Sequence, residues 1–256
     1  MADYQTLLVR FQEPVLFVQI NRPEANNTIN ALLIEEFHKV INEYEKKMSV
    51  LVIEGQKDVF CFGGDFQGIH DQIAAGNEDI DDPERLYDLW LKLAVGPYIT
   101  ISHVRGKANA GGVGFVAASD IVLADETALF SLSELLFGLY PACVLPFLIS
   151  KMGYQKSHYM TVMTKPISVQ QAHTWGLVDA FHENSEGLLR QHLMRLKNLP
   201  KDGIIRYKKY MGEMKEMLII YKHRSIAANK EIFADAQNLD RIFMFVEKGQ
   251  YPWENK

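Results

Sequence analysis

The chain has 256 residues, of which 48% are hydrophobic and 23% are charged, a composition typical of a globular protein with a substantial core. The formal net charge of −5 argues against nucleic acid as the main partner. No stretch approaches the ~18 apolar residues of a membrane span, and the amino-terminal residues do not have the pattern of an export signal. We therefore expect a cytoplasmic protein without a membrane partner.

The first sixty residues predict a strand, a helix and a second strand. Residues 14–20, P-V-L-F-V-Q-I, have the composition of a strand, which Pro23 ends shortly afterwards. Between residues 32 and 44, apolar side chains recur every three or four positions, as in an amphipathic helix. Residues 49–54, S-V-L-V-I-E, form a β-branched run typical of a buried parallel strand. This order indicates an α/β fold.

Residues 59–69, V-F-C-F-G-G-D-F-Q-G-I, contain a strand-like run that stops at paired glycines. One explanation is a tight turn in which Gly63 or Gly64 takes a positive φ. The other is a bare backbone whose N–H reaches a ligand oxygen. Asp65 is expected to cap the following helix, and Cys61 to fill apolar space.

Residues 71–85 are acidic and contain Gly and Pro, which predicts a mobile surface stretch that orders when a ligand binds. A helix should follow, with a stripe that includes Tyr87, Trp90 and Leu93 in the core or at a subunit interface. Residues 98–104 predict another strand, in which His103 is expected to be a satisfied core or interface histidine.

A second glycine pair, Gly111-Gly112, also follows a predicted strand. Two such N–H groups could point at one oxygen atom, and removing one donor from an oxyanion hole costs on the order of 3 kcal/mol of transition-state stabilisation. Short strands are expected at residues 120–124 and 128–131, and the chain should be mostly helical from about Glu186.

Five ordered segments together resemble the crotonase (enoyl-CoA hydratase/isomerase) family. They are I-N-R-P-E-A-N-N-T-I-N at 20–30, C-F-G-G-D-F at 61–66, G-K-A-N-A-G-G-V-G-F at 106–115, F-S-L-S-E-L-L-F-G-L-Y-P at 130–141 and K-P-I-S-V-Q-Q-A-H-T-W-G-L-V-D at 165–179. The resemblance implies a crotonase-like ββα spiral core over residues 1–185 and a C-terminal helical trimerisation region over residues 186–256. It also implies a homotrimer or a hexamer.

The same resemblance assigns roles to individual residues. The N–H groups of Gly64 and Gly111 would hold a thioester carbonyl oxygen, and Gly112 would let the helix start approach closely. Glu134 would be the general acid/base, and its apolar neighbours should raise its pKa toward neutrality. No metal is implied, and the only carrier group is the phosphopantetheine of an acyl carrier protein or of coenzyme A.

One position departs from the family pattern. Simple hydratases carry a second catalytic glutamate where this chain has Gly114. A single carboxylate favours the loss of a tertiary hydroxyl group over the addition of water. The motifs resemble most the family's dehydratase of polyketide β-methyl branching, which converts 3-hydroxy-3-methylglutaryl-acyl carrier protein to 3-methylglutaconyl-acyl carrier protein. A decarboxylase, isomerase or hydratase of a related thioester, or a non-catalytic acyl-carrier-binding scaffold, remain as alternatives.

Such a substrate carries a distal carboxylate that calls for donors in the pocket. We expect Asn109 first and then Tyr140 as neutral donors, and Lys92, Arg105 and Lys107 as cations. The basic stretches at 208–215 and 221–224 either dock an acidic carrier protein or form a solvated helix face. Cys143, like Cys61, is expected to be an apolar filler.

Overall fold

The computed structural model describes residues 4–74 and 82–254. Its larger sheet has six strands in the order β1-β2-β3-β5-β7-β10. All neighbours are parallel except β1, which forms an antiparallel hairpin with β2. The strands are β1 (Leu7–Gln12), β2 (Val15–Ile20), β3 (Val50–Glu54), β5 (Ile99–Val104), β7 (Ile121–Ala124) and β10 (Ala180–Phe181).

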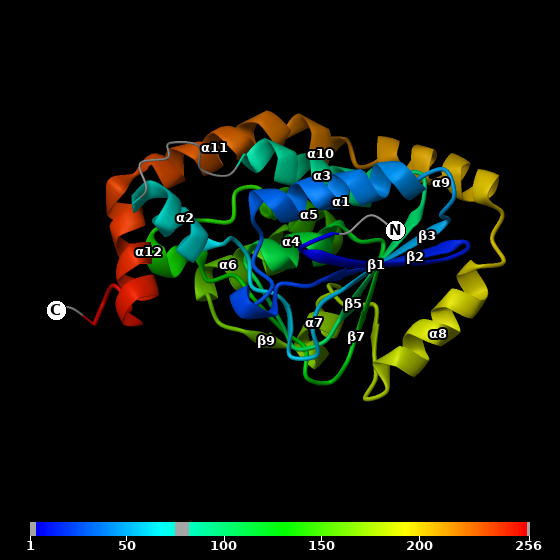
Figure 1. The fold of residues 1–256 in the computed structure, drawn as a ribbon, viewed down its shortest axis with the longest axis horizontal. Coiled ribbons are helices and arrows are strands. Elements are labelled where there is room, and N and C mark those ends of the chain that lie inside the picture. The colour runs from blue at the N-terminus through cyan, green and yellow to red at the C-terminus, as the bar shows by residue number, and fades with distance from the viewer. Residues whose placement is uncertain (1–3, 75–81, 255–256) are drawn as a thin grey trace.

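Helices cover both faces of this sheet, as alternating strand residues require. Val15 and Val50 pack with Leu189 of helix α8 (Ser185–Leu196) on one face. Their neighbours Leu16 and Leu51 belong to the main core on the other face. That core also contains residues of α1 (Ala31–Tyr44), α3 (Pro83–Val95) and α4 (Gly111–Ala118). Figure 1 shows α1 and α3 on the side away from α8.

The smaller sheet positions the site. It has four strands in the order β4-β6-β8-β9, and β4, β6 and β8 are parallel. Their bounds are β4 (Val59–Cys61), β6 (Lys107–Asn109), β8 (Leu129–Ser131) and β9 (Ile167–Ser168). Because neighbouring strands point the same way, the loops that follow them emerge at one edge.

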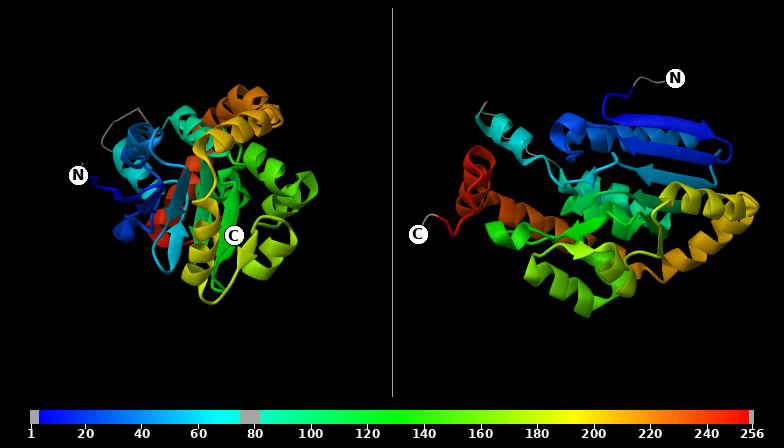
Figure 2. Two further views of the ribbon diagram at one scale, coloured as in Figure 1. Left: turned by 90° about the vertical axis from the view of Figure 1, so that its right-hand side faces the viewer. Right: turned by 90° about the horizontal axis from the view of Figure 1, so that it is seen from below.

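The C-terminal helices run along the molecule from the α8 side to the opposite end, where the chain ends (Figures 1 and 2). They are α9 (Lys201–Glu213), α10 (Glu216–Ile220), α11 (Lys222–Ala234) and α12 (Ala236–Lys248). At that end α12 contacts α2 (Phe66–Ala74) and η2 (Glu134–Phe137). The remaining elements are η1 (Pro23–Ala25), α5 (Leu145–Met152), α6 (Tyr154–Met163) and α7 (Val169–Thr174).

The α/β fold and its main elements agree with the sequence-based predictions, although β6, α5 and α6 were not predicted and two further regions differ. Strand β1 was not predicted, although its sequence L-L-V-R-F-Q is largely apolar; its alternate side chains, Leu8 among them, are exposed. The stretch 71–85 was predicted to be a mobile surface segment, and at its two ends residues 71–74 belong to α2 and residues 83–85 to α3. The part between them, residues 75–81, lies outside the described residues, as does the predicted ordering on ligand binding. No helix among the described residues is long and apolar enough to cross a bilayer.

Candidate active site

The three segments that carry the expected chemistry follow three neighbouring strands. Gly64 follows β4, Gly111 follows β6, and Glu134 lies shortly after β8. These strands are adjacent and parallel. Their carboxyl ends therefore bring together residues that are up to seventy positions apart in the sequence, as at the ligand-binding edge of other parallel sheets.

The two glycine loops touch each other. Gly63 has a φ of 94°, a conformation that favours glycine. A Cβ added at Gly63 would lie 2.7 Å from the Ala110 Cβ and 3.2 Å from the Gly111 nitrogen. The first explanation of the glycine pair is thus confirmed at Gly63, which provides the positive φ and also lets the second loop approach. The second, an N–H that reaches a ligand oxygen, stays a prediction.

The backbone N–H groups of Gly64 and Gly111 have no hydrogen-bond acceptor among the described residues. On either side of Gly64, the Ile29 N–H donates to the Gly63 oxygen at 2.7 Å and the Asp65 N–H donates to the Ile29 oxygen at 3.0 Å. Gly111 begins α4, where the first N–H groups have no intrahelical partner. Ala110 before it has a φ of 50°, an uncommon conformation that sets the direction of this peptide. Two unpaired donors on touching loops are what an oxyanion hole requires.

Gly112 and Gly114 are required by close packing. A Cβ at Gly112 would overlap the carbonyl oxygen of Cys61 at the end of β4, which agrees with the expected close approach of the helix start. A Cβ at Gly114 would overlap the indole of Trp90. The space beside position 114 is therefore filled by a tryptophan from α3.

Glu134 is the first residue of η2, and its carboxyl group is buried. Its Oε2 is buried and has no hydrogen-bond partner in the described part of the chain. Burial raises the pKa of this carboxyl from 4.5 to about 7, against smaller opposing contributions from the backbone N–H groups of Glu134 and Ser133. A carboxyl with this pKa can both accept and return a proton near neutral pH.

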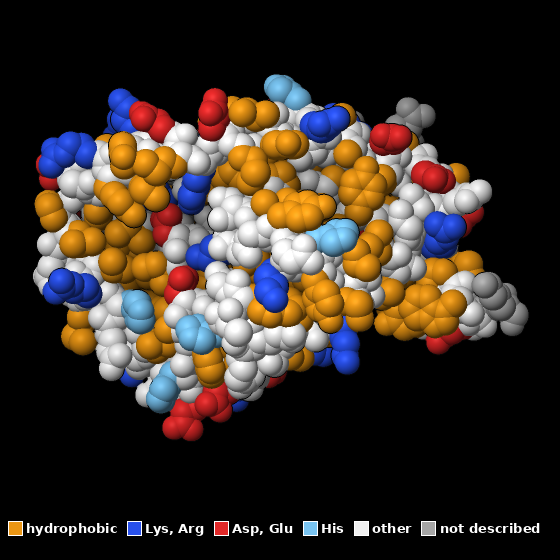
Figure 3. Space-filling view, turned by 180° about the vertical axis from the view of Figure 1, so that it is seen from behind, with side chains coloured by type: hydrophobic (Ala, Val, Ile, Leu, Met, Phe, Trp, Pro, Cys, Tyr) orange, Lys and Arg blue, Asp and Glu red, His pale blue; other side chains and the backbone are white. Residues whose placement is uncertain are grey.

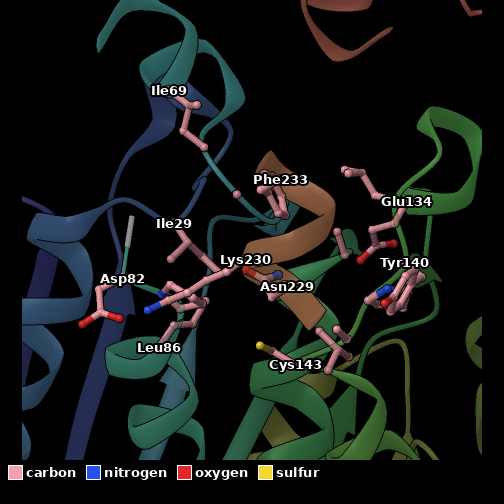
Figure 4. Close-up of a pocket in the computed structure, with 18 of the residues that line it drawn as sticks. Ile29, Ile69, Asp82, Leu86, Glu134, Tyr140, Cys143, Asn229, Lys230 and Phe233 are labelled. Carbon is pink, nitrogen blue, oxygen red and sulfur yellow. The ribbon is translucent and has the colours of Figure 1, made fainter. Parts of the chain in front are cut away.

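Gly64, Gly111, Glu134 and Tyr140 line one cavity of about 570 Å³. Its wall is mostly apolar, with Ile29, Ile34, Phe66, Ile69, Leu86, Trp90, Leu139, Val144, Phe233 and Leu239 among the lining residues. Figure 4 shows Glu134 and Tyr140 on the same side of this cavity and Asp82 on the opposite side. The volume suits a small acyl group attached to a carrier arm.

Asn109 does not line the cavity but ties the loops together. Its amide donates to the Ser133 hydroxyl at 3.1 Å and to the Phe62 carbonyl at 3.4 Å. Its oxygen accepts from the Ser131 hydroxyl at 2.7 Å. These bonds connect the β4 loop to the segment just before Glu134. The expectation that Asn109 binds substrate stays a prediction.

The cations expected in the pocket lie elsewhere. The ammonium group of Lys92 donates to Asn42 at 2.9 Å, because residues two positions apart on a helix face different sides and Trp90 faces the cavity. Arg105 pairs with Glu186 at 3.4 Å, and Lys107 does not line the cavity either. Among the described residues that line it, the cation is Lys230 of α11, next to Asn229. No local sequence signal marked these two residues.

The proposed carrier-docking stretches are also largely committed to internal contacts. Lys208 is buried and pairs with Asp120 at 2.6 Å. Lys215 donates to the Ala94 carbonyl at 3.2 Å, and Lys222 pairs with Asp88 at 2.7 Å. The sequence left two interpretations open, a docking surface for an acidic carrier protein and a solvated helix face. Neither describes these three lysines.

Other expectations are confirmed by the contacts. His103 is fully buried and lies 2.9 Å from both Glu54 and Ser185. Asp65 accepts from the Gly68 N–H at 3.1 Å, as a cap of α2 should. Cys61 is buried, and burial raises the pKa of its thiol to about 12, so it is not a nucleophile at neutral pH. Cys143 is buried too, although it also lines the cavity.

The sequence model of enoyl-CoA hydratase/isomerase matches residues 10–256. The chain belongs to this family. The membership confirms the crotonase resemblance and makes the protein an enzyme of the hydratase type. The chain is similar to the bacillaene synthase dehydratase PksH of Bacillus subtilis (strain 168), with 56% identity over all of this chain and 99% of the relative.

One further relative and two solved structures are also similar to the chain. The 2,3-dehydroadipyl-CoA hydratase of Escherichia coli (strain K12) is 31% identical over 67% of each chain. The crystal structure of the polyketide biosynthesis enoyl-CoA hydratase (pksH) from Bacillus subtilis covers 98% of this chain and all of its own, with a TM-score of 0.95 and 56% identity. An enoyl-CoA hydratase/isomerase from Acinetobacter baumannii shares the fold, with a TM-score of 0.84 at 23% identity.

Proposed function

We propose that this protein dehydrates 3-hydroxy-3-methylglutaryl-acyl carrier protein to 3-methylglutaconyl-acyl carrier protein in polyketide β-methyl branching. The observation that carries the proposal is a single carboxyl with a pKa of about 7 in a cavity that two unpaired N–H groups also line. The similarity to a protein named as a polyketide dehydratase supports the direction of the reaction and its pathway.

The reaction needs one proton to move from C2 to the hydroxyl group on the neighbouring carbon, C3. The Gly64 and Gly111 N–H groups bind the thioester oxygen and stabilise the negative charge that develops there when C2 loses its proton. The ionised Glu134 accepts that proton. As a neutral acid, Glu134 then gives it to the C3 hydroxyl group while the C3–O bond breaks. Water leaves, the C2–C3 double bond forms, and Glu134 is again ionised.

The other carboxylates among the described lining residues are poorly suited to share this work. Asp82 accepts from the Glu84 N–H at 2.9 Å as the cap of α3. Glu84 pairs with Lys222 at 3.0 Å, and this bond holds its pKa below the usual value. The space beside Gly114 is filled by Trp90. The arrangement therefore favours Glu134 as both the base and the acid.

Lys230 gives the cavity the positive charge that a substrate with a distal carboxylate calls for. The acyl group would enter on a phosphopantetheine arm, which requires no other cofactor. Purified protein should be incubated with the hydroxymethylglutaryl thioester on a carrier protein and on coenzyme A, with the acyl mass measured over time. Loss of one water supports dehydration, whereas loss of carbon dioxide, or no change, refutes it.

Replacing Glu134 with Gln tests the mechanism, because the amide cannot carry the proton. We expect the rate to fall at least about 100-fold, the usual contribution of general acid–base catalysis. Glu183→Gln, at an exposed position, is the matched control and should keep the wild-type rate. Equal rates for wild type and Glu134→Gln would support a scaffold that only binds acyl carriers.

We further propose that the protein is cytoplasmic and assembles into a homotrimer or hexamer. Large apolar side chains are exposed on α6 and from α9 through Tyr221, where Tyr154, Val162, Tyr207, Tyr210, Met214, Ile219 and Ile220 are each more than half exposed. The view from behind shows several groups of hydrophobic side chains at the surface (Figure 3). Light scattering after size exclusion measures the mass, and Ile220→Asp should reduce it if this surface is an interface.

A further inference from the structure

Trp90 has a polar atom that nothing in the described structure satisfies. Its side chain is 1% exposed, and its indole Nε1 is buried without a hydrogen-bond partner in the described residues. A buried donor left without an acceptor costs about 1–3 kcal/mol, and a phenylalanine would avoid that cost. Buried tryptophan N–H groups usually find an acceptor. We therefore look for the acceptor of the Trp90 N–H in a ligand of the cavity.

Three observations place Trp90 at the reacting end of the cavity. Trp90 lines the same cavity as Gly64, Gly111 and Glu134. Its indole fills the space directly beside Gly114. Gly114 is one turn after Gly111 on the same helix, about 4.5 Å along the axis. An acyl chain whose carbonyl oxygen lies at the Gly111 N–H thus has its C3, two bonds beyond the carbonyl carbon, within reach of this part of the wall.

The indole is held in one position by its neighbours. The rings of Phe115 and Phe147 meet it edge to face, with centroids at 6.0 and 5.9 Å. Trp90 is one of the largest fully buried side chains of the core. A donor fixed in this way binds an acceptor with little further loss of side-chain entropy.

The chemistry of the donor and its surroundings selects the acceptor. An indole N–H carries no charge and can only donate. A carboxylate with one neutral donor in a mostly apolar wall would remain poorly solvated, whereas an uncharged oxygen would not. Lys230 offers the distal carboxylate a better partner elsewhere on the wall.

We infer that the Trp90 N–H donates a hydrogen bond to the C3 hydroxyl oxygen of the substrate. This inference rests on the proposed function and names a specificity-determining residue for it. The bond orients the hydroxyl group for protonation by Glu134 and stabilises the oxygen as the C3–O bond lengthens. Trp90 itself transfers no proton.

The test measures binding to two unreactive ligands. One is an amide analogue of 3-hydroxy-3-methylglutaryl-pantetheine, and the other is its 3-methylglutaryl counterpart, which lacks the hydroxyl group. Replacing Trp90 with 3-benzothienylalanine keeps the ring shape and substitutes sulfur for the N–H. We expect this replacement to weaken binding of the hydroxylated ligand about tenfold, which is about 1.4 kcal/mol, and to leave the other ligand unchanged. If the protein with 3-benzothienylalanine does not fold, Trp90→Phe is the substitute. It should likewise weaken binding of the hydroxylated ligand more than binding of the other ligand.

A spectroscopic readout separates hydrogen bonding from packing. The chain has three tryptophans, so ¹⁵N-labelled indole gives three N–H signals, with Trp175 and Trp253 as internal references. The hydroxylated ligand should move the Trp90 signal downfield more than the other ligand does. Equal losses of affinity for both ligands, or no loss, overturn the inference while the proposed function stands. If the wild-type protein binds neither ligand, both the inference and the proposed function are refuted.

Discussion

Glu134→Gln should stabilise the protein, and the gain should depend on pH. The pKa of Glu134 rises from 4.5 to about 7 on folding, because burial disfavours the ionised form. Each pKa unit corresponds to about 1.4 kcal/mol. Between pH 4.5 and 7 the unfolded state ionises this carboxyl while the folded state keeps it neutral, so wild-type stability falls as the pH rises. Above pH 7 the loss reaches its full value, on the order of 3 kcal/mol.

The assay is urea unfolding at pH 5 and at pH 8, at one fixed protein concentration. Gln carries no charge at either pH. We therefore expect the variant to exceed wild type by about 2–3 kcal/mol at pH 8 and by less than about 1 kcal/mol at pH 5. Glu183→Gln, at the exposed control position, should change stability by less than about 0.5 kcal/mol at both. A gain that is equal at pH 5 and pH 8, or absent at pH 8, would refute the buried-carboxyl argument.

Other properties follow from the same geometry. The kcat/KM for dehydration should rise as the active-site carboxyl ionises, with a midpoint near pH 7, and a profile flat from pH 5 to 9 would contradict its role as the initial base. Gly112→Ala should lower the free energy of unfolding by at least about 2 kcal/mol, because the new methyl group overlaps the Cys61 carbonyl oxygen. In the control Gly203→Ala the methyl group has ordinary clearance, so urea unfolding should show no loss or a gain in stability. Lys208→Ala should cost about 3 kcal/mol by removing a buried ammonium group from its ion pair with the partly exposed Asp120, while Lys209→Ala at the adjacent exposed position should cost almost nothing. Similar thermal shifts for the two variants would count against the ion pair.

Much of the site was accessible from short stretches of sequence. The apolar run before Gly63 predicted a strand that ends at bare backbone, and β4 is present there. The strand predicted at residues 98–104 is β5, whereas β6, which leads to Gly111, was not predicted because Lys107–Asn109 has no apolar run. The apolar neighbours of Glu134 predicted a raised pKa, which its burial in the structure produces. These properties depend on a few consecutive residues, so local pattern was enough to find them.

The binding side chains were harder to predict. Asn109 lies next to the second glycine loop and was expected to bind substrate, and its amide donates to Phe62 and Ser133. The basic 208–215 stretch looked like surface charge, yet Lys208 is buried against Asp120. In each case, the hydrogen-bond partner is more than twenty positions away in the sequence.

The sequence alone determined the family and the strand-ending glycines and predicted the acid–base role of Glu134, because these depend on contiguous motifs. Only the tertiary structure decided which side chains share the cavity with them. Parallel pairing of β4, β6 and β8 brings the three loops to one edge, and packing from α3 and α11 adds Trp90 and Lys230 to the wall. Such contacts depend on how distant helices pack against the sheet edge, and no local periodicity encodes that choice.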